Sequence, residues 1–298
     1  MLPPTLYQPK EPEPLGEVLK RAGKRALGGG IPGAAAMGIQ VLSLMWLRTT
    51  VNYQYRYGTT TTHAFKTLYS QGGIPRFYRG LGPALLQAPL SRFGDTAANA
   101  GTLSLLESYE STKKLPVPVK TLAASAASAA FRIFLMPIDA TKTIMQVEGQ
   151  GGFGKLRAKV TKSGPRVLYH GALAASAATF VGHYPWFLTY NYLNETLPQY
   201  DDLKRKLLRS AFIGFSASAI SDTVSNSIRV IKTSKQAATD AVTYPQVTRE
   251  ILEKEGLMGL LGRGLKTKII ANGAQGMLFT VLWRLGQDYW NRQAPAAN

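Results

Sequence analysis

The sequence predicts an all-α membrane protein in which six transmembrane helices form three tandem two-helix repeats, with a short helix inside each repeat. Two observations predict this fold. Long apolar segments recur along the chain, and one motif returns at a period of roughly 90 residues. Three such repeats can close around a pseudo-threefold axis, since each contributes an equivalent pair of long helices.

Two apolar segments are long enough to cross a bilayer. Residues 26–47 carry no charge and residues 171–194 carry only a histidine, and each exceeds the roughly 20 apolar residues that a spanning helix needs. Small residues such as AASAASAA, which begins at Ala123, favour close helix packing in lipid. Weaker candidate spans follow at 81–108, 117–145, 207–236 and 265–290.

The composition is strongly basic, with 35 Lys and Arg against 17 Asp and Glu and a formal net charge of +18. Such an excess suits nucleic acid, an anionic membrane or anionic solutes. The basic residues flank apolar spans instead of forming one face, so we expect no nucleic-acid partner. The chain has no cysteine, its three histidines are far apart, and no serine, histidine and acid converge by spacing. We therefore expect no metal site, no cofactor and no enzymatic activity.

A motif in the middle of the chain, FLMPIDATKTIMQ (134–146), combines a proline with an acid and a base in an apolar helix. Proline kinks a helix, and Asp139 and Lys142 share one helical face. Related segments stand at 43–52 and 227–236. Their alignment places in register the bases Arg48, Lys142 and Lys232, each followed by threonine, and the glutamines Gln146 and Gln236.

A glycine-containing turn follows each motif, at 72–80, 163–171 and 255–264. Each repeat is therefore a long helix, a short amphipathic helix, the turn and a second long helix. We expect the short helices near residues 61–70, 153–162 and 244–254. The expected division of the chain is an N-terminal tail at 1–19, repeats at 20–112, 113–203 and 204–292, and a C-terminal tail at 293–298.

At these residues the chain resembles the mitochondrial carrier family (solute carrier family 25), over about residues 20–292. The match is best in the middle repeat, where Pro137, Asp139, Lys142 and Gln146 fit the pattern P-x-[DE]-x-x-[KR]-x-x-x-Q. The resemblance implies a multi-pass protein of the inner mitochondrial membrane that transports a small-molecule solute by alternating access. It also implies short helices on the matrix side and cardiolipin as a lipid partner.

The resemblance further implies a gate of acid–base pairs at the matrix end of a central cavity, where helices kinked at residues such as Pro137 converge. By position, Asp139 should pair with Lys232, and Gln146 should brace a pair from beneath. Ionisable residues at membrane depth are costly and usually functional, which fits this role. The expected gate network is Arg48, Asp139, Lys142, Gln146, Arg229, Lys232 and Gln236.

The first and third repeats depart from the pattern. Serines (Ser43 and Ser227) replace the proline, and Met45 and Arg229 replace the acid. The expected ring therefore carries four bases against Asp139, an excess of three positive charges. Two like charges about 8 Å apart repel by about 2 kcal/mol at an effective dielectric of about 20. Either something anionic lies there, or that end stays open, or the bases point outward.

The second gate of the family, an aromatic-acid-x-x-base motif on the even helices, has lost its ion pairs here. Its positions by count are Tyr190, Asn191, Asn194, Trp283, Arg284 and Gln287. Amide hydrogen bonds, worth about 1 kcal/mol each, could replace part of it. The positions that match the family's solute contacts are Gln87, Arg92, Thr179, His183 and Asn272. These residues are equally consistent with polar side chains satisfied at helix contacts.

Two functions are compatible with these residues. The preferred one is a divergent carrier that moves a small solute across the inner mitochondrial membrane, and the basic ring indicates that this solute is an anion. The alternative is a carrier fold that no longer transports and serves as a structural subunit of a larger inner-membrane complex. Two observations favour this alternative: both gates have lost most of their ion pairs, and the residues at the solute positions are mild.

Overall fold

The computed structural model describes residues 16–17, 30–108, 110–238, 240, 242–276 and 278, and its regular elements there are helical. The long helices are α2 (Gly30–Tyr57), α5 (Leu81–Ser108), α7 (Val117–Phe134), α8 (Met136–Glu148), α10 (Ala172–Thr196), α11 (Leu203–Ala237) and a last helix at 265–276. The shorter elements are α3 (Thr61–Ser70), α4 (Gly73–Phe77), α6 (Glu110–Lys113), η1 (Gly149–Gly151), α9 (Gly152–Ser163), η2 (Pro165–Tyr169) and α12 (Tyr244–Gly262).

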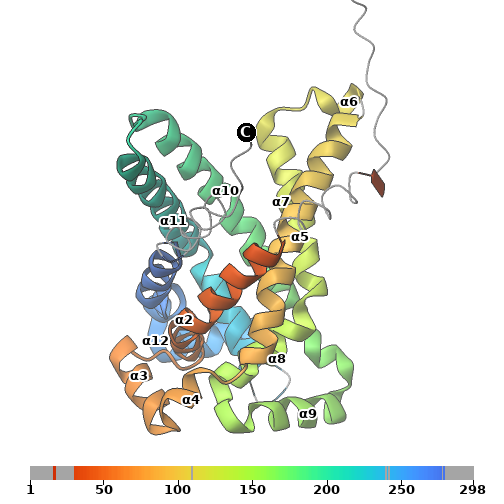
Figure 1. Cartoon of the computed structure of the whole chain (residues 1–298). Coiled ribbons are helices and arrows are strands. Elements are labelled where there is room, and N and C mark those ends of the chain that lie inside the picture. The colour runs from red at the N-terminus through yellow and green to blue at the C-terminus, as the bar shows by residue number, and fades with distance from the viewer. Residues whose placement is uncertain are drawn as a thin grey trace, which may run out of the picture.

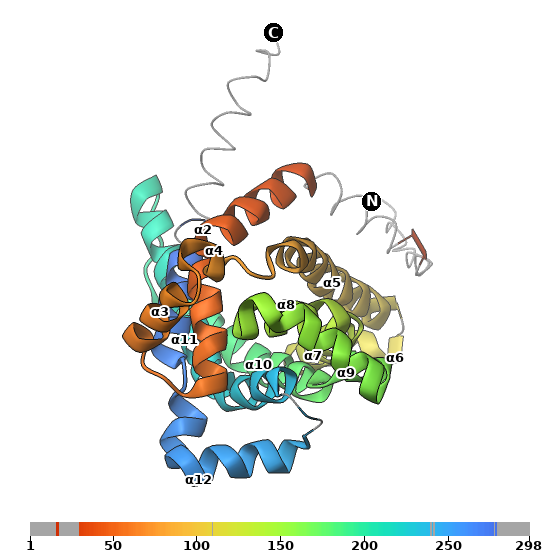
Figure 2. The same cartoon turned by 90° about the horizontal axis from the view of Figure 1, so that it is seen from below.

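The long helices pack into a bundle, and the short helices α3, α9 and α12 lie at one end of it (Figure 1). Seen from that end, these three short helices lie at the periphery (Figure 2). Helix α2 packs on α5 and α11, α5 packs on α7 and α8, and α10 packs on α7 and α11. The chain thus forms three successive helical units, each in contact with the next.

Within the described residues, none of the helices taken alone has both the length and the apolarity to cross a membrane. The bent pair formed by Val119–Phe134 and Met136–Ser163, which turns by 65° at its break, meets both conditions together.

Each short helix packs its apolar face on the long helix that precedes it. Leu68 of α3 lies in a cluster with Tyr53 of α2, and Leu156 of α9 lies in one with Ile144 of α8. Val247 of α12 is buried with residues of α2 and α11. The expected short helices are therefore present, and α12 extends beyond its expected end because it resumes after a break at Gly256.

The turn glycines make equivalent contacts around the bundle. A Cβ atom on Gly80 would lie 3.1 Å from the carbonyl oxygen of Lys142 in the second unit. A Cβ atom on Gly171 would lie 3.3 Å from the carbonyl oxygen of Lys232 in the third unit, and one on Gly264 would lie 3.0 Å from the ring of Tyr55 in the first. All three have positive φ angles. Each unit therefore packs its turn against the next unit in cyclic order.

The carbonyl groups at the end of each long helix receive a cation in the same cyclic order. Arg76 donates to the carbonyls of Gln146 and Val147 at the end of α8, at 2.8 and 2.7 Å. Lys159 donates to the carbonyl of Gln236 in α11, and Arg263 donates to two carbonyls at the end of α2. Such carbonyls lack partners within their own helix, so a nearby cation compensates them.

The small residues of α7 allow close packing on both sides. Ala124, Ser125 and Ser128 are buried, and α7 contacts both α5 and α10. On the side of α5, a Cβ atom on Gly94 would overlap the ring of Phe131. The expectation that these small residues bring helices close together is consistent with these contacts.

The turn geometry generates a stability prediction. Gly80→Ala forces an L-residue into a left-handed conformation, at φ +84°, against a backbone oxygen that cannot move aside. We expect it to lower the free energy of unfolding by about 1–2 kcal/mol, measured as a lower midpoint of thermal unfolding in detergent. The matched control is Gly154→Ala in helix α9, where no atom lies within 4 Å of the added Cβ. Equal loss in both variants would contradict the proposed close contact.

Candidate functional site

The proline of the central motif separates two helices. Helix α7 ends at Phe134 and α8 begins at Met136, with Pro137 in the first turn of α8. Proline has no N–H to donate to the preceding turn, which accounts for a break here. Serines stand at the matching positions of the first and third units, Ser43 and Ser227, and there α2 and α11 each continue as one helix. Of the three equivalent positions, only the one that holds the proline divides its helix in two.

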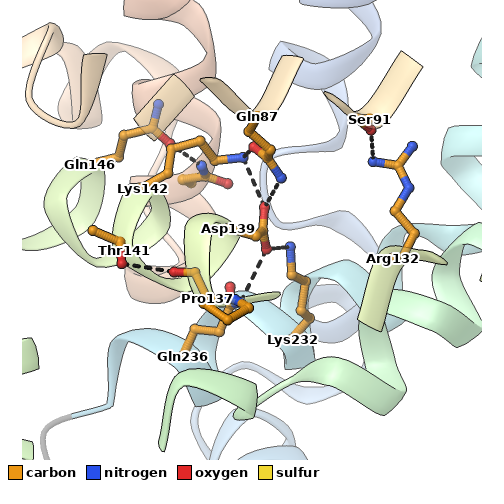
Figure 3. A network of polar contacts seen from close by, with 11 residues as sticks. Gln87, Ser91, Arg132, Pro137, Asp139, Thr141, Lys142, Gln146, Lys232 and Gln236 are labelled. Carbon is orange, nitrogen blue, oxygen red and sulfur yellow. Dashed lines mark hydrogen bonds and ion pairs between the residues drawn. The ribbon is translucent and has the colours of Figure 1, made fainter. Parts of the chain in front are cut away.

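The carboxylate just after this break is the centre of a polar network (Figure 3). Asp139 is only 6% exposed. Its Oδ1 accepts from Lys142 Nζ at 2.9 Å and from Gln87 Nε2 at 2.7 Å. Its Oδ2 forms an ion pair with Lys232 Nζ and accepts from Gln236 Nε2 at 3.1 Å. One carboxylate thus joins helices α5, α8 and α11.

The Asp139–Lys232 contact expected from the sequence is present in this network. A buried carboxylate is costly unless charged and hydrogen-bonding groups compensate it, and here two lysines and two amides do so. Of the three outcomes considered for the ring of bases, the outward orientation does not apply to Lys142 or Lys232, since both turn toward Asp139.

Gln87 was expected among the solute contacts in the middle of the cavity, but it is part of this network. Its amide donates to Asp139 and its carbonyl oxygen accepts from Lys142 Nζ. An amide can bridge an acid and a base in this way because it carries both a donor and an acceptor. The repeat count alone could not reveal this, because it fixes the position along the helix and not the partner across it.

Gln146 does not brace the pair as expected. Its Oε1 accepts from Asn52 Nδ2 at 2.6 Å, so it joins α8 to α2. It lies two helical turns beyond Asp139, which places its amide out of reach of that carboxylate. The aligned residue of the third unit, Gln236, bonds to Asp139 instead.

The remaining bases of the expected ring have neutral partners. Arg48 Nη2 donates to Gln275 Oε1 at 2.7 Å, and Arg229 Nε donates to Ser225 Oγ at 3.1 Å, one turn back on its own helix. Across the described parts of the chain, neither guanidinium is ion-paired with a carboxylate.

Sequence reasoning missed two charged residues of this cluster. Asp222 on α11 is 5% exposed and accepts from the amide of Asn272, and Lys268 on the last helix interacts electrostatically with Asp222, Arg229 and Arg48. Both lie outside the repeated motif, and the one available signal was a charge within an apolar span. The described cluster then has five bases against two acids, namely Arg48, Lys142, Arg229, Lys232 and Lys268 against Asp139 and Asp222.

A second ion pair, half-buried, lies on the same face of α5. Arg132 of α7 pairs with Asp95 at 2.8 Å and also donates to Ser91 (Figure 3). Gln87, Ser91 and Asp95 are spaced four residues apart and therefore line one side of the helix. The sequence marked Arg132 as a charge within a span, but its partner was not foreseen.

The other expected solute contacts bond to separate partners. Thr179 donates to the carbonyl of Ala175 on its own helix at 3.0 Å, and His183 Nδ1 lies 3.2 Å from Ser125 Oγ of α7. Asn272 donates to Asp222. The side chain of Arg92 lies outside the described part of the structure. Of these, His183 and Asn272 make contacts between helices, and Thr179 is satisfied within its own helix.

Of the residues expected at the second gate, the structure describes only those on α10. Tyr190 stacks on Trp186 with ring centroids 5.0 Å apart, and Asn191 is exposed. Asn194 Oδ1 accepts from Arg209 Nη1 of α11 at 2.9 Å, so an amide contact joins the two helices there. Trp283, Arg284 and Gln287 lie outside the described residues.

The turn of the second unit has His170 where the other two turns have arginine, Arg79 and Arg263. Burial lowers the pKa of His170 below its ordinary value, and the nearby Lys235 and Lys159 lower it further. The imidazole is therefore neutral at pH 7, and this turn lacks the positive charge of its two counterparts.

Comparison with known proteins relates this arrangement to one family. A model of the mitochondrial carrier protein family matches residues 113–201 and 204–293. Protein dif-1 of Caenorhabditis elegans is 34% identical over a segment that covers 39% of this chain and 41% of that protein. The match thus spans less than half of that relative. The residues before 113 lie outside both ranges of the family model, but Gly80 and Arg76 there make the same cyclic contacts as their counterparts.

The network around Asp139 generates a second prediction. Asp139→Asn keeps the shape of the side chain but leaves Lys142 and Lys232 without their carboxylate, so we expect a loss of about 3–5 kcal/mol in the free energy of unfolding. Thermal unfolding of the purified protein measures it. The control is Asp240→Asn, which removes an exposed carboxylate that lies 3.7 Å from Lys162, and there the loss should stay below about 1 kcal/mol. Similar losses in both variants would mean that the Asp139 network stabilises the fold no more than an exposed ion pair does.

Proposed function

The chain belongs to the mitochondrial carrier family, and from this premise we propose that it moves a small anionic solute across the inner mitochondrial membrane by alternating access. Members of this family are solute transporters and not enzymes. The observation that carries the proposal is the Asp139 network, which joins three helices through contacts that can break and re-form at one end of the bundle.

A multi-pass arrangement of six spans is part of the proposal. The cyclic contacts of the turn glycines support a threefold bundle, in which the long helices stand side by side. Large apolar side chains point away from the bundle on several of these helices, among them Phe134 (74% exposed), Leu173 (69%) and Leu208 (70%). Apolar groups exposed in this number on a bundle exterior suit contact with lipid.

The anionic nature of the solute is inferred from charge. Five bases face two acids in the cluster around Asp139, and such an excess raises the local concentration of anions. The same excess would repel a cation. A solute with one or two negative charges therefore fits best, and its entry would reduce the repulsion among the bases.

Alternating access then follows because Asp139 and a bound anion compete for the same lysines. In the closed arrangement, Lys232 of α11 pairs with Asp139 of α8 and holds the two helices together. Opening requires this pair to separate, and a bound anion that attracts the lysines can offset part of that cost. A ligand shifts such an equilibrium only by its difference in affinity between the two states. An anion held by Lys232 in the open state meets that condition.

The alternative, a transport-inactive subunit of a larger complex, is not favoured by the comparisons. It rested on the loss of ion pairs at both gates. The Asp139 network retains one acid that engages bases of two units, although Arg48 and Arg229 have no carboxylate partner among the described residues.

Uptake into proteoliposomes tests the proposal. Purified protein is reconstituted, and the uptake of labelled phosphate, sulfate, dicarboxylates and cationic amino acids is compared. We expect uptake of at least one anion and a fall of roughly tenfold or more in Lys232→Gln. The control is Lys162→Gln, which replaces a lysine whose side chain is 80% exposed. Folded wild-type protein that takes up none of these solutes would overturn the proposal.

A further inference from the structure

Three bases of the cluster lack a carboxylate partner. Arg48 is bonded to an amide and Arg229 to a hydroxyl, while the described residues offer Lys268 no ion pair. This differs from Lys142 and Lys232, which share Asp139. The unbalanced charge of the cluster therefore lies on three side chains from the first and third units.

These three side chains come from helices that meet. Helix α2 contacts α11, and Arg48 of α2 reaches Gln275 of the last helix. Tyr55 of α2 donates to Asn226 of α11 at 3.0 Å. The junction of α2, α11 and the last helix is thus closed by hydrogen bonds that include no carboxylate.

Helical spacing places Lys268 on the face of the last helix that meets this junction. Lys268, Asn272 and Gln275 follow one another by four and three residues, so they share one face of the last helix. The last two of these already contact the other two helices. Lys268 interacts electrostatically with Arg48 and Arg229 as well as with Asp222. One carboxylate, Asp222, therefore faces three bases.

The repeat register shows what this junction lacks. Position 229 of the third unit corresponds to Asp139 of the second, and it holds a base where the second unit holds an acid. Asp139 joins the second unit to the third through Lys232. Between the third unit and the first, the acid that would join Arg48 to α11 is replaced by a further positive charge.

We propose that Arg48, Arg229 and Lys268 bind one small divalent anion, a phosphate, sulfate or dicarboxylate, which joins the third unit to the first. After Asp222 is counted, two positive charges remain, and they match a divalent ligand. Guanidinium groups suit such a ligand because their N–H donors pair with two oxygens of a carboxylate or phosphate at once. This inference rests on the proposed function, because the anion bound here is taken to be the transported solute. Binding is nevertheless measurable without transport.

Thermal unfolding in detergent tests the binding. Inorganic phosphate and sulfate are compared with chloride at equal ionic strength, on the full-length protein. At about 100 times its Kd, a ligand of the folded state should raise the unfolding midpoint by roughly 5–10 °C. In Arg229→Asp, which restores the acid of the repeat pattern, the unliganded midpoint should rise and the shift with phosphate should vanish.

Two further variants keep the test decisive. The control Arg249→Asp makes the same substitution on α12 and should keep the full phosphate shift. The Arg249 side chain is 82% exposed, and among the described residues it pairs with Glu253 along its own helix. If Arg229→Asp fails to fold, Arg48→Gln should reduce the shift with less disturbance, since it removes one charge and can keep an amide contact. No shift in the wild type, or an undiminished shift in both site variants, would overturn the inference.

Uptake of labelled phosphate and sulfate separates the two sources of the anion. Uptake that falls in Arg229→Asp together with the thermal shift identifies the bound anion as the transported solute. A thermal shift without uptake of these ions identifies a resident counter-ion that completes the fold. In that case binding stands while the proposed function fails, if the other solutes are not transported either.

Discussion

The buried carboxylate of Asp139 constrains the whole helical bundle. A single acid at this depth requires compensation, and it receives it from a base of its own helix, a base of the next unit and two amides. These partners lie on three helices, so the Asp139 carboxylate links α5, α8 and α11. Moving any of the three helices breaks at least one of these contacts, and separating α8 from α11 leaves Lys232 without its carboxylate.

The packing contacts repeat in all three units, whereas the acids and bases differ between the units. The three turns, the three short helices and the three cations at helix ends repeat their contacts around the bundle. These contacts involve backbone atoms, glycines and apolar side chains, where almost any change creates a clash or a cavity. The charged layer tolerates more variation, because the loss of one acid can be offset by a ligand or by a neighbouring amide.

This difference explains what could be predicted from the sequence. The break at Pro137 and the turn glycines follow from backbone rules that act locally, so their positions were foreseen. The Asp139–Lys232 contact was expected from the resemblance to the carrier family, which implies acid–base pairs between neighbouring repeats. The partners of Gln87 and Gln146 were not, because the tilt and rotation of each helix decide which side chains meet.

Residues outside the repeated motif were harder to find. Asp222, Lys268 and the Asp95–Arg132 pair belong to no repeated pattern, and within one sequence they differ from ordinary surface charges only by their apolar surroundings. Helix position indicates that such a residue is buried, but not which of several neighbouring helices supplies its counter-charge. A three-dimensional arrangement is needed for that step.

The unbroken course of α11 determines how motion at one end reaches the other. With 35 residues, this helix is about 52 Å long, well beyond the roughly 30 Å of a hydrocarbon core. It lacks the proline that divides α7 from α8, so its backbone hydrogen bonds continue past the equivalent position. A rotation of about 5° around its Lys232 end would displace the opposite tip by about 4 Å. The second unit, in contrast, has a joint at Leu135 that can absorb such a rotation within itself.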